Sequence, residues 1–295
     1  MIWLWVGVVV ILIAVLLLLE SRRECNSLSV EIQIIQSSKI TKPYRFVFLS
    51  DLHDHEFGEQ NHRLIEAVES TNPDAILIGG DMMNVREGKV GTRITEDLLR
   101  GLVKIAPVYY ANGNNEQRFR WENENFESEY QAFLRILDDF GVHYLDNKSE
   151  QFEEVRITGL NIELGHYREF ICKKLTTEYI TNAVGKADGS RYNLLLIHSP
   201  MFPEVYRSWG ADLALAGHSH GGIIRFPTDR KKVRGRLNND RGLVSGQYQL
   251  FHKYCAGYFE KDGRAMIVSR GLGTHTVKLR INNKPQVVVV DLIEA

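Results

Sequence analysis

Residues 45–53 read Arg45-Phe46-Val47-Phe48-Leu49-Ser50-Asp51-Leu52-His53, an apolar run of strand type that stops where an Asp-x-His pair begins. Aromatic and β-branched residues at this density predict a buried strand. An aspartate carboxylate and a neutral imidazole are both suitable ligands for a divalent metal ion. The stretch therefore predicts a strand that presents two metal ligands on the loop at its end.

Further polar segments follow other apolar runs along the chain. They are Gly79-Gly80-Asp81, Gly113-Asn114-Asn115-Glu116, Ile197-His198, Gly217-His218 and Ser219-His220. Together with Asp51 and His53 they supply enough ligands for two metal ions. A pair of metal ions can hold a phosphate, lower the pKa of a bound water and neutralise charge in the transition state. The pattern thus predicts hydrolysis of phosphate esters.

The ligands divide into two sets around one shared carboxylate, for which Asp81 is the natural candidate. The first set is Asp51, His53 and His220, and the second is Asn114, His198 and His218. In Asp-x-His and His-x-His, alternate residues of a locally extended segment face the same side, so both side chains can converge. Glycine in Gly-His lets the backbone come close to the metals.

Around these motifs, the first half of the chain alternates strands with helices and the second half is rich in strands. Apolar spacing predicts helices over 60–70, 95–103 and 126–140. Strands are predicted over 45–50, 75–78, 108–111, 142–145, 153–160, 194–197, 213–216, 257–259, 265–269 and 287–292. This order favours two sheets packed face to face with helices outside. Loops at strand ends, where the ligands fall, commonly carry the site in α/β folds.

The N-terminus is an unbroken apolar run from Ile2 to Leu19, about 27 Å long as a helix and close to the thickness of a bilayer core. It lacks a basic start, so we expect an uncleaved single-pass anchor in the cell membrane rather than a signal peptide. Arg22 and Arg23 follow the run and favour a cytoplasmic catalytic domain. The expected divisions are an anchor over 1–20, a lead-in over 21–36 that includes alternating apolar residues, and one domain over 37–295.

Composition sets outer limits. The chain of 295 residues is 44% hydrophobic and 25% charged, as in a folded globular protein. Its net charge of -1 gives no bulk attraction to nucleic acid, so no nucleic-acid partner is expected. The 3 cysteines are far apart and form no disulfide framework or metal-type pair.

From about residue 44 to 292, the chain resembles the calcineurin-like metallophosphoesterases, whose pattern is Asp-x-His, Gly-Asp, Gly-Asn-His-Asp/Glu, His and Gly-His-x-His. It is most similar to their bacterial membrane-anchored or exported branch, through Gly217-His218-Ser219-His220-Gly221-Gly222-Ile223-Ile224-Arg225-Phe226-Pro227, Val268-Ser269-Arg270-Gly271-Leu272-Gly273, Leu279-Arg280-Ile281-Asn282 and the strand after Pro285. The resemblance implies a four-layer α/β/β/α sandwich and two divalent ions, Mn, Fe or Zn, with Mn favoured. One group near this branch cleaves the diphosphate of UDP-2,3-diacylglucosamine.

One position departs from the family pattern. After Gly113-Asn114 the family has a histidine, credited with stabilising the phosphate and protonating the leaving oxygen, where this chain has Asn115. An amide can donate a hydrogen bond but not a proton, and loss of a general acid costs about 10²–10⁴-fold when the leaving group needs one. Asn115 therefore favours a diphosphate or activated ester. The alternatives are that His55, His166 or His275 supplies the proton, or that the enzyme is slow.

Arg270 is the other candidate catalytic residue, because its guanidinium suits a bidentate contact to phosphate; a structural ion pair is the alternative. The sequence as a whole predicts a membrane-anchored dinuclear phosphohydrolase that cleaves a phosphodiester or diphosphate bond, with a lipid-linked or envelope substrate favoured by the anchor. A cyclic-nucleotide or general phosphodiesterase is the nearest alternative. A metal-binding membrane scaffold without catalysis is the alternative from another class.

Overall fold

Two six-stranded sheets dominate the computed structural model, which describes residues 1–86, 89–121, 123–167, 173–225, 242–244, 254–274 and 278–295. The first sheet has the order β1 (Ser29–Ser37), β16 (Gln286–Glu294), β2 (Tyr44–Leu49), β3 (Ala75–Ile78), β6 (Val108–Tyr110) and β7 (His143–Tyr144). Strands β2, β3, β6 and β7 are parallel, β16 is antiparallel to β2, and β1 is parallel to β16.

The second sheet has the order β14 (Gly257–Lys261), β15 (Arg264–Val268), β11 (Leu213–Ala216), β10 (Tyr192–Ile197), β9 (Val155–Leu160) and β8 (Lys148–Phe152). Its centre, β15 to β9, is parallel, and a hairpin strand closes each edge. Two small pairs lie apart: β4 (Val85–Arg86) with β5 (Lys89–Val90), and β12 (Ile224–Arg225) with β13 (Gly242–Val244).

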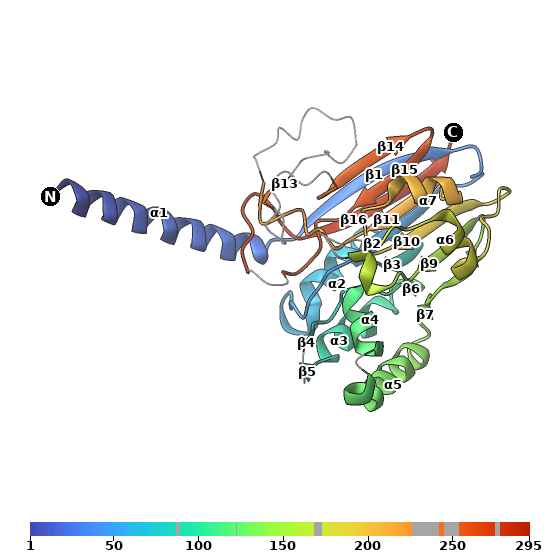
Figure 1. Ribbon diagram of the computed structural model, residues 1–295, viewed down its shortest axis with the longest axis horizontal. Coiled ribbons are helices and arrows are strands. Elements are labelled where there is room, and N and C mark those ends of the chain that lie inside the picture. Colours follow the sequence, from blue (N-terminus) through green and yellow to red (C-terminus); the bar gives the residue numbers. More distant parts are fainter. Residues whose placement is uncertain (87–88, 122, 168–172, 226–241, 245–253, 275–277) are drawn as a thin grey trace.

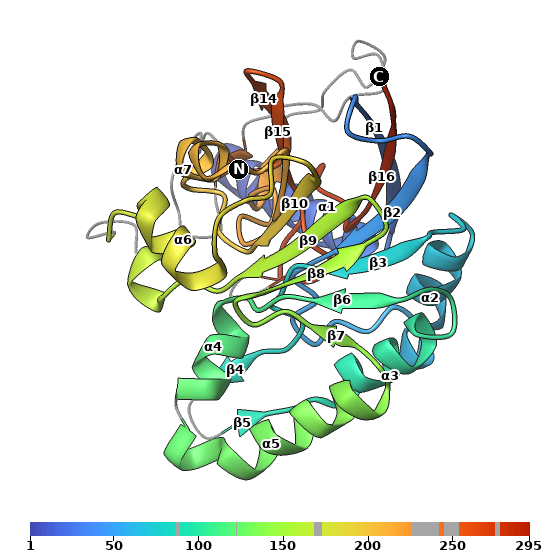
Figure 2. The same cartoon turned by 90° about the vertical axis from the view of Figure 1, so that its right-hand side faces the viewer.

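Three apolar clusters show how the layers pack. Phe46, Phe48 and Leu77 of the first sheet meet Leu194 and Leu215 of the second, so the sheets face each other across a shared core. The outer face of the first sheet is covered by α2 (His62–Glu69), α3 (Arg93–Leu102), α4 (Asn114–Trp121) and α5 (Asn123–Asp139), and that of the second by α6 (Thr177–Val184) and α7 (Pro203–Trp209). The molecule is the predicted four-layer α/β/β/α sandwich (Figures 1 and 2).

A single helix, α1 (Ile2–Cys25), projects from the sandwich (Figure 1). Its apolar residues from Ile2 to Leu19 are exposed, and among the described residues it is the one helix long and apolar enough to cross a membrane. Two short 3₁₀ helices, η1 (Glu59–Asn61) and η2 (Leu164–Tyr167), complete the described elements.

The sheet begins earlier than the boundary expected at residue 37. Strand β1 lies inside the expected lead-in and pairs with β16 from Ser29 to Ser37. The alternating apolar residues of the expected lead-in, Val30, Ile32 and Ile34, belong to this strand, but their side chains lie on its exposed face, while Gln33 is buried. Helices α4, α6 and α7 were not predicted: they are short, and α4 begins within a predicted ligand motif.

Candidate metal centre

Parallel strands that end at the same edge bring the predicted ligands together. Asp51 follows β2 and Asp81 follows β3. His198 is the residue directly after the end of β10. Asn114 opens α4 just beyond β6, and His218 and His220 follow β11. Both sheets therefore contribute to one site, as loops at the carboxyl ends of strands commonly do.

The first group of ligand atoms comes from Asp51, His53 and His220, all within 4.8 Å of one another. His220 Nε2 lies 3.4 Å from Asp51 Oδ1, and His53 Nε2 lies 3.9 Å from the same oxygen. This is the set predicted for the first metal ion.

The second group comes from Asp51, Asp81 and His198, again within 4.8 Å. Asp81 Oδ2 lies 3.4 Å from His198 Nε2 and 3.6 Å from His53 Nε2, so it faces a histidine of each predicted set. A bridging carboxylate requires this position. Asp51 Oδ1 also reaches across, at 3.7 Å from His198 Nε2.

Three histidines present the same nitrogen to the carboxylates. Nδ1 lies 3.0 Å from Asn84 Oδ1 in His53, 2.7 Å from the Gly79 carbonyl in His198 and 3.2 Å from the Gly273 carbonyl in His220. An acceptor oxygen requires the hydrogen on Nδ1, so each neutral ring carries its lone pair on Nε2. Ring orientation by a second partner is typical of metal-binding histidines.

The most telling contact is between two of these rings. His53 Nε2 lies 3.1 Å from His220 Nε2, and both rings already donate from Nδ1. Two lone pairs at this distance repel unless a positive charge lies between or beside them. A cation next to Asp51 would relieve this repulsion.

Unpaired buried atoms mark the second set. Among the described residues, His198 Nε2 and Asn114 Oδ1 are buried without a hydrogen bond; the 3.4 Å contact of His198 with Asp81 lacks hydrogen-bond geometry. His218 packs its ring against His198, with centroids 5.2 Å apart, and its backbone N–H donates to Asp51 Oδ1 at 3.0 Å. Such atoms cost free energy unless a ligand satisfies them, and nitrogen and oxygen donors of this kind fit a divalent metal ion.

The electrostatics favour a cation. Burial opposes a charge on His198, but the carboxylates of Asp81 and Asp51 outweigh it and raise the pKa of this imidazole to about 10. Burial alone would raise the pKa of Asp81, but His198 and His53 lower it well below its usual value. Burial and the charge of His198 lower the pKa of His218 to about 3, so that ring is neutral and able to bind a metal.

The backbone at the ligands is not the extended conformation that the Asp-x-His and His-x-His patterns predicted. Asp51, His53, Asp81, His218 and His220 all have positive φ, between 47° and 68°. The left-handed region is rare and unfavourable for residues other than glycine. The side chains converge because the chain turns sharply at each ligand, not because alternate residues of a strand share a face.

Glycines allow the loops to approach the ligands closely. A Cβ at Gly217 would lie 2.0 Å from Ser50 Oγ and 2.4 Å from Asp51 Oδ2, and one at Gly113 would lie 2.3 Å from Asp81 Oδ1. The close approach expected at the Gly-His motif is therefore to the carboxylate ligand itself. A side chain at either position would displace an aspartate.

Asn115 donates hydrogen bonds to the candidate metal ligand Asp81. Its Nδ2 donates to Asp81 Oδ2 at 2.7 Å, its backbone N–H donates to Asp81 Oδ1 at 2.8 Å, and its Oδ1 accepts from the Val85 N–H. The residue is fully buried. It therefore orients the candidate bridging carboxylate.

Glu116 is a structural part of the site whose role the sequence did not reveal. Its carboxylate is buried and accepts from the N–H groups of Asp81, Met82 and Gly113 and from the Tyr110 hydroxyl. Burial and the nearby Asp81 raise its pKa. These bonds tie the loop after β3 to the loop after β6. The sequence signal for this role was the position of Glu116 in the ligand motif, one residue after Asn115.

Arg270 is held by the protein. Its Nη2 lies 2.5 Å from Glu31 Oε1 and its Nε donates to the Lys284 carbonyl at 3.1 Å, which is the structural ion pair that the sequence left open. Of the alternative proton donors, His55 is half-buried, and His166 is buried with Nδ1 at 2.9 Å from the Lys173 carbonyl. His275 lies outside the described residues.

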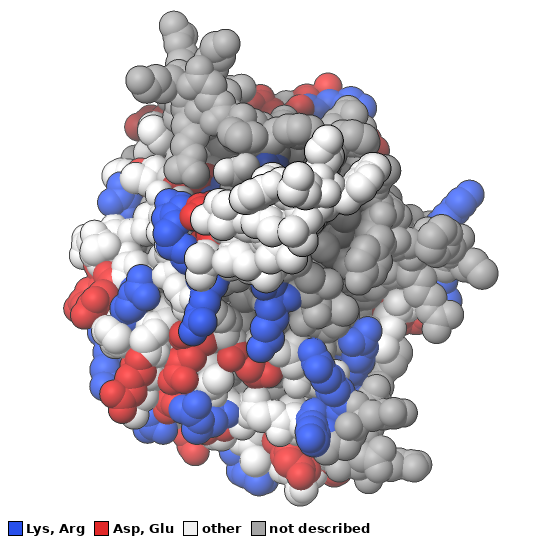
Figure 3. Space-filling model, turned by 90° about the vertical axis from the view of Figure 1, so that its left-hand side faces the viewer, with Lys and Arg blue, Asp and Glu red and all other residues white. Residues whose placement is uncertain are grey.

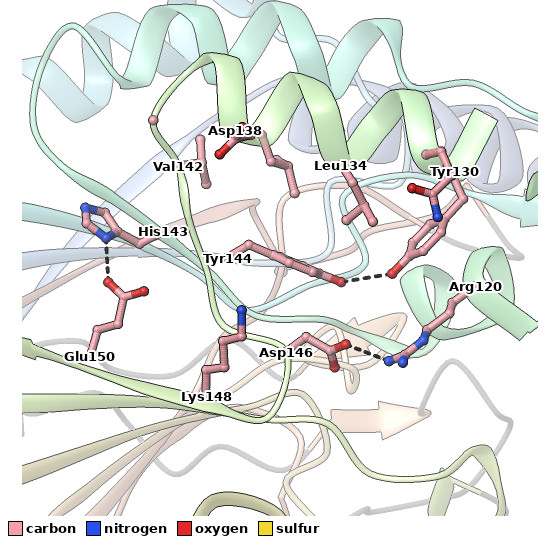
Figure 4. A pocket seen from close by; sticks show the side chains of 13 residues that line it. Arg120, Tyr130, Leu134, Asp138, Val142, His143, Tyr144, Asp146, Lys148 and Glu150 are labelled. Carbon is pink, nitrogen blue, oxygen red and sulfur yellow. Dashed lines mark hydrogen bonds and ion pairs between the residues drawn. The ribbon is translucent and has the colours of Figure 1, made fainter. Parts of the chain in front are cut away.

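A separate hollow of about 760 Å³ lies between α5, β7 and β8 (Figure 4). Two ion pairs lie across its walls, Arg120 with Asp146 at 2.6 Å and His143 with Glu150 at 2.5 Å. Its wall residue Tyr144 donates from its hydroxyl to Asn112 Oδ1, two residues before Asn114. We assign no binding role to it.

A sandwich of two mixed sheets with a cluster of carboxylates and imidazoles at its strand ends is the architecture of a metal-dependent enzyme. The family model for calcineurin-like phosphoesterases matches residues 44–222, more than half of the chain. The chain belongs to this family, and it is an enzyme of the class that hydrolyses phosphoric esters with metal ions.

Three relatives are similar to this chain over most of its length. The chain is 27% identical to the uncharacterized protein YpbG of Bacillus subtilis, over 90% of this chain and 88% of that protein. It is 25% identical to the phosphodiesterase YaeI of Escherichia coli, over 85% and 83%. It is also 25% identical to the UDP-2,3-diacylglucosamine pyrophosphatase LpxG of Chlamydia muridarum, over 69% of this chain and 57% of that protein.

Proposed function

We propose that this chain is a membrane-anchored phosphohydrolase that uses two divalent cations to cleave a phosphodiester or diphosphate bond. The observation that carries the proposal is the pair of Nε2 atoms of His53 and His220, 3.1 Å apart beside Asp51. A divalent cation beside Asp51 would relieve that contact while both rings keep their Nδ1 partners.

Each cation has its own set of residues. Asp51, His53 and His220 would hold one, and Asn114, His198 and His218 the other, with Asp81 shared. Mixed oxygen and nitrogen donors suit Mn, Fe or Zn, and Mn is the favoured choice. When bound, such ions would supply an activated water and neutralise charge on the phosphate.

The chain's own residues restrict the substrate. Asn115 is committed to Asp81 and has no ionisable proton, so the position where the family has a histidine offers no general acid. A phosphate or nucleotide leaving group is a weak base and departs without one, whereas an alkoxide does not. This supports a diphosphate or activated diester as substrate. Arg270 keeps a predicted role in orienting the phosphate, through a guanidinium that Glu31 already holds.

The exposed apolar helix α1 supports anchoring in the cell membrane, and burial of Ser21 and Glu24 packs its last turn into the domain. A tethered enzyme meets membrane-bound substrates at high local concentration. We therefore favour a lipid-linked or envelope substrate. The name of the relative LpxG, a pyrophosphatase acting on a diacylated sugar nucleotide, points the same way. Arg22 and Arg23 favour the cytoplasmic face.

The test is hydrolysis of bis-p-nitrophenyl phosphate by the full chain in detergent, with Mn²⁺ added. This diester has a good leaving group, so a missing general acid does not mask activity. We expect turnover that a chelator abolishes and that Asp81→Asn lowers at least 100-fold, while Asp139→Asn, on the exposed side of α5, leaves it unchanged.

The alternatives give different results. Absence of turnover with Mn, Fe, Zn or Co, in protein that binds two metal ions, would identify a metal-binding scaffold instead. Turnover of cyclic AMP in preference to diphosphates would identify a cyclic-nucleotide phosphodiesterase.

A further inference from the structure

The last turn of α1 is built into the domain. Ser21 and Glu24 are buried, with exposed fractions of 1% and 4%. Ser21 Oγ accepts from the Arg280 N–H at 2.9 Å, and Glu24 Oε2 accepts from the Asn283 N–H at 2.8 Å. We call these four residues the helix joint.

The helix joint reaches the metal centre in one further step. Asn283 Nδ2 donates to the carbonyl of His220 at 2.7 Å. Arg280 Nη2 donates to the carbonyl of Gly273, which also accepts from His220 Nδ1. The membrane helix and a candidate metal ligand are therefore parts of one hydrogen-bonded unit.

No flexible segment separates the apolar helix from the domain. Leu19 is the last residue of the apolar run, and Glu20 alone stands between it and buried Ser21. From Leu19 to Glu24 a helix rises about 7.5 Å. The headgroup region on one side of a bilayer is of similar thickness, about 5–7 Å. With Leu19 at the edge of the hydrocarbon core, the helix joint lies at headgroup depth.

The ligand next to the helix joint is partly exposed. The side chain of His220 is 16% exposed, whereas those of His53 and His198 are 1% and 0% exposed. The domain face around the foot of α1 carries Lys and Arg side chains next to Asp and Glu side chains (Figure 3). Arg22 and Arg23 end α1, Arg23 pairs with Glu20 at 2.5 Å, and Arg63 donates to the Asn26 carbonyl there. The basic side chains of this mixed face can contact anionic headgroups.

We propose that the helix joint holds the metal centre at headgroup depth, so that the enzyme acts on phosphate groups of lipids within the bilayer surface. This inference rests on the proposed function and specifies its substrate class. The anchor then sets the height and orientation of the site, in addition to raising local concentration.

The test uses the full chain reconstituted in phosphatidylcholine vesicles with two p-nitrophenyl substrates. One is soluble bis-p-nitrophenyl phosphate, and the other is the p-nitrophenyl ester of phosphatidic acid in the same bilayer. The variant carries a flexible Gly-Ser insertion of about 12 residues between Leu19 and Glu20, which adds a mean span of about 19 Å. The control carries the same insertion between Asp262 and Gly263, in the exposed β14–β15 turn.

We expect the native chain and the control to hydrolyse both esters. The linker variant should keep soluble turnover within about twofold and lose at least fivefold on the lipid ester, because its site no longer stays at the surface. Equal turnover of the lipid ester by the linker variant and the native chain would overturn the inference, as would a native chain that cleaves only the soluble ester. Absence of soluble turnover in every chain would instead remove the proposed function, and this inference with it.

A second readout does not depend on activity. A fluorophore on Lys278→Cys, exposed and two residues from Arg280, is placed in a chain whose own 3 cysteines are replaced by alanine. Lipids with a nitroxide on the headgroup should quench it strongly in the chain without an insertion and weakly in the linker variant. Equal quenching in the two would show that the helix joint does not fix the depth.

Discussion

At the scale of single residues, the amide of Asn115 and its backbone N–H donate to different oxygens of one carboxylate, that of Asp81. Two donors fix both the rotation and the position of that side chain. A carboxylate held in this way keeps its ligand oxygen facing His53 and His198. Asn115 is therefore a positioning residue that acts through Asp81.

Asn115→Ala removes the side-chain donor and leaves the backbone donor. Loss of such a supporting partner typically lowers metal affinity about 10–100-fold, and we expect Mn²⁺ binding to weaken by at least tenfold in isothermal titration calorimetry. Asn115→His, whose ring can also donate, should stay within a few-fold of the native chain. Asn182→Ala, on an exposed position of α6, is the control. Native affinity in the alanine variant would contradict this role.

His198 gives the metal centre a pH dependence. Because its pKa is raised to about 10 from an ordinary 6.5, the metal-free protein holds this proton at pH 8. The charged ring contributes stability that is fully present below about pH 6.5 and is lost as the pH rises through 10. A metal ion bound by Nε2 must displace the proton, so metal affinity should rise with pH.

Calorimetry at pH 8 in buffers of different ionisation enthalpy measures this proton directly. We expect close to one proton released from His198 as its metal ion binds. In His198→Asn, the number of protons released on metal binding should fall to the number that the remaining groups release. If the native chain released no proton at pH 8, the pKa of His198 would be that of an ordinary imidazole. That result would contradict the positive charge assigned to His198 in the metal-free protein.

The spacing of polar residues after strands was enough to predict which side chains meet, because parallel strands end at one edge of each sheet. The left-handed backbone at Asp51, His53 and His220 was not predictable. Glycine is the strong signal of positive φ, whereas aspartate and histidine are enriched there but still adopt it in only a few per cent of cases. The conformation is imposed by the fold around the site.

At the scale of elements, α4 illustrates what periodicity misses. It begins at Asn114, inside the ligand motif, and its first turn is Asn-Asn-Glu-Gln. No apolar stripe announces such a helix. Its first residues are held by the loop after β3, through Asn115 and Glu116, instead of by an apolar face. Helices with a clear apolar stripe, α2, α3 and α5, were predicted within a few residues of their ends.

The last turn of α1 belongs to the catalytic domain, so truncation should depend on where it is made. A chain that begins at Glu20 keeps Ser21 and Glu24, and one that begins at Asn26 leaves the buried N–H groups of Arg280 and Asn283 without acceptors. Each buried unpaired group costs about 1–3 kcal/mol. We expect the shorter chain to lose about 2–6 kcal/mol of unfolding free energy in urea titrations.

Glu24→Gln in the chain that begins at Glu20 separates the hydrogen bond from the charge. The amide oxygen can still accept from Asn283, so most of the stability should remain. Equal stability of the two truncated chains would show that the helix joint does not contribute to the fold.

At the scale of the whole molecule, the two sheets were predictable because their strands are short, apolar and interrupted at regular points. The partners within each sheet were not. Strand β16 lies between β1 and β2, although most of the chain separates it from both. The sequence of an apolar strand does not indicate which strand it pairs with, and the register of the pair is set by tertiary packing.

The position of β16 between β1 and β2 has a consequence for biosynthesis. About 240 residues must be made between the end of β2 and the start of β16, which takes on the order of 10–50 s on the ribosome. Throughout that interval β1 and β2 lack the strand that lies between them in the folded sheet. Their unpaired edges can pair with other chains and promote aggregation. Asp51 follows β2 and shares that edge of the sheet. We therefore expect the nascent chain to stay inactive until translation has passed β16.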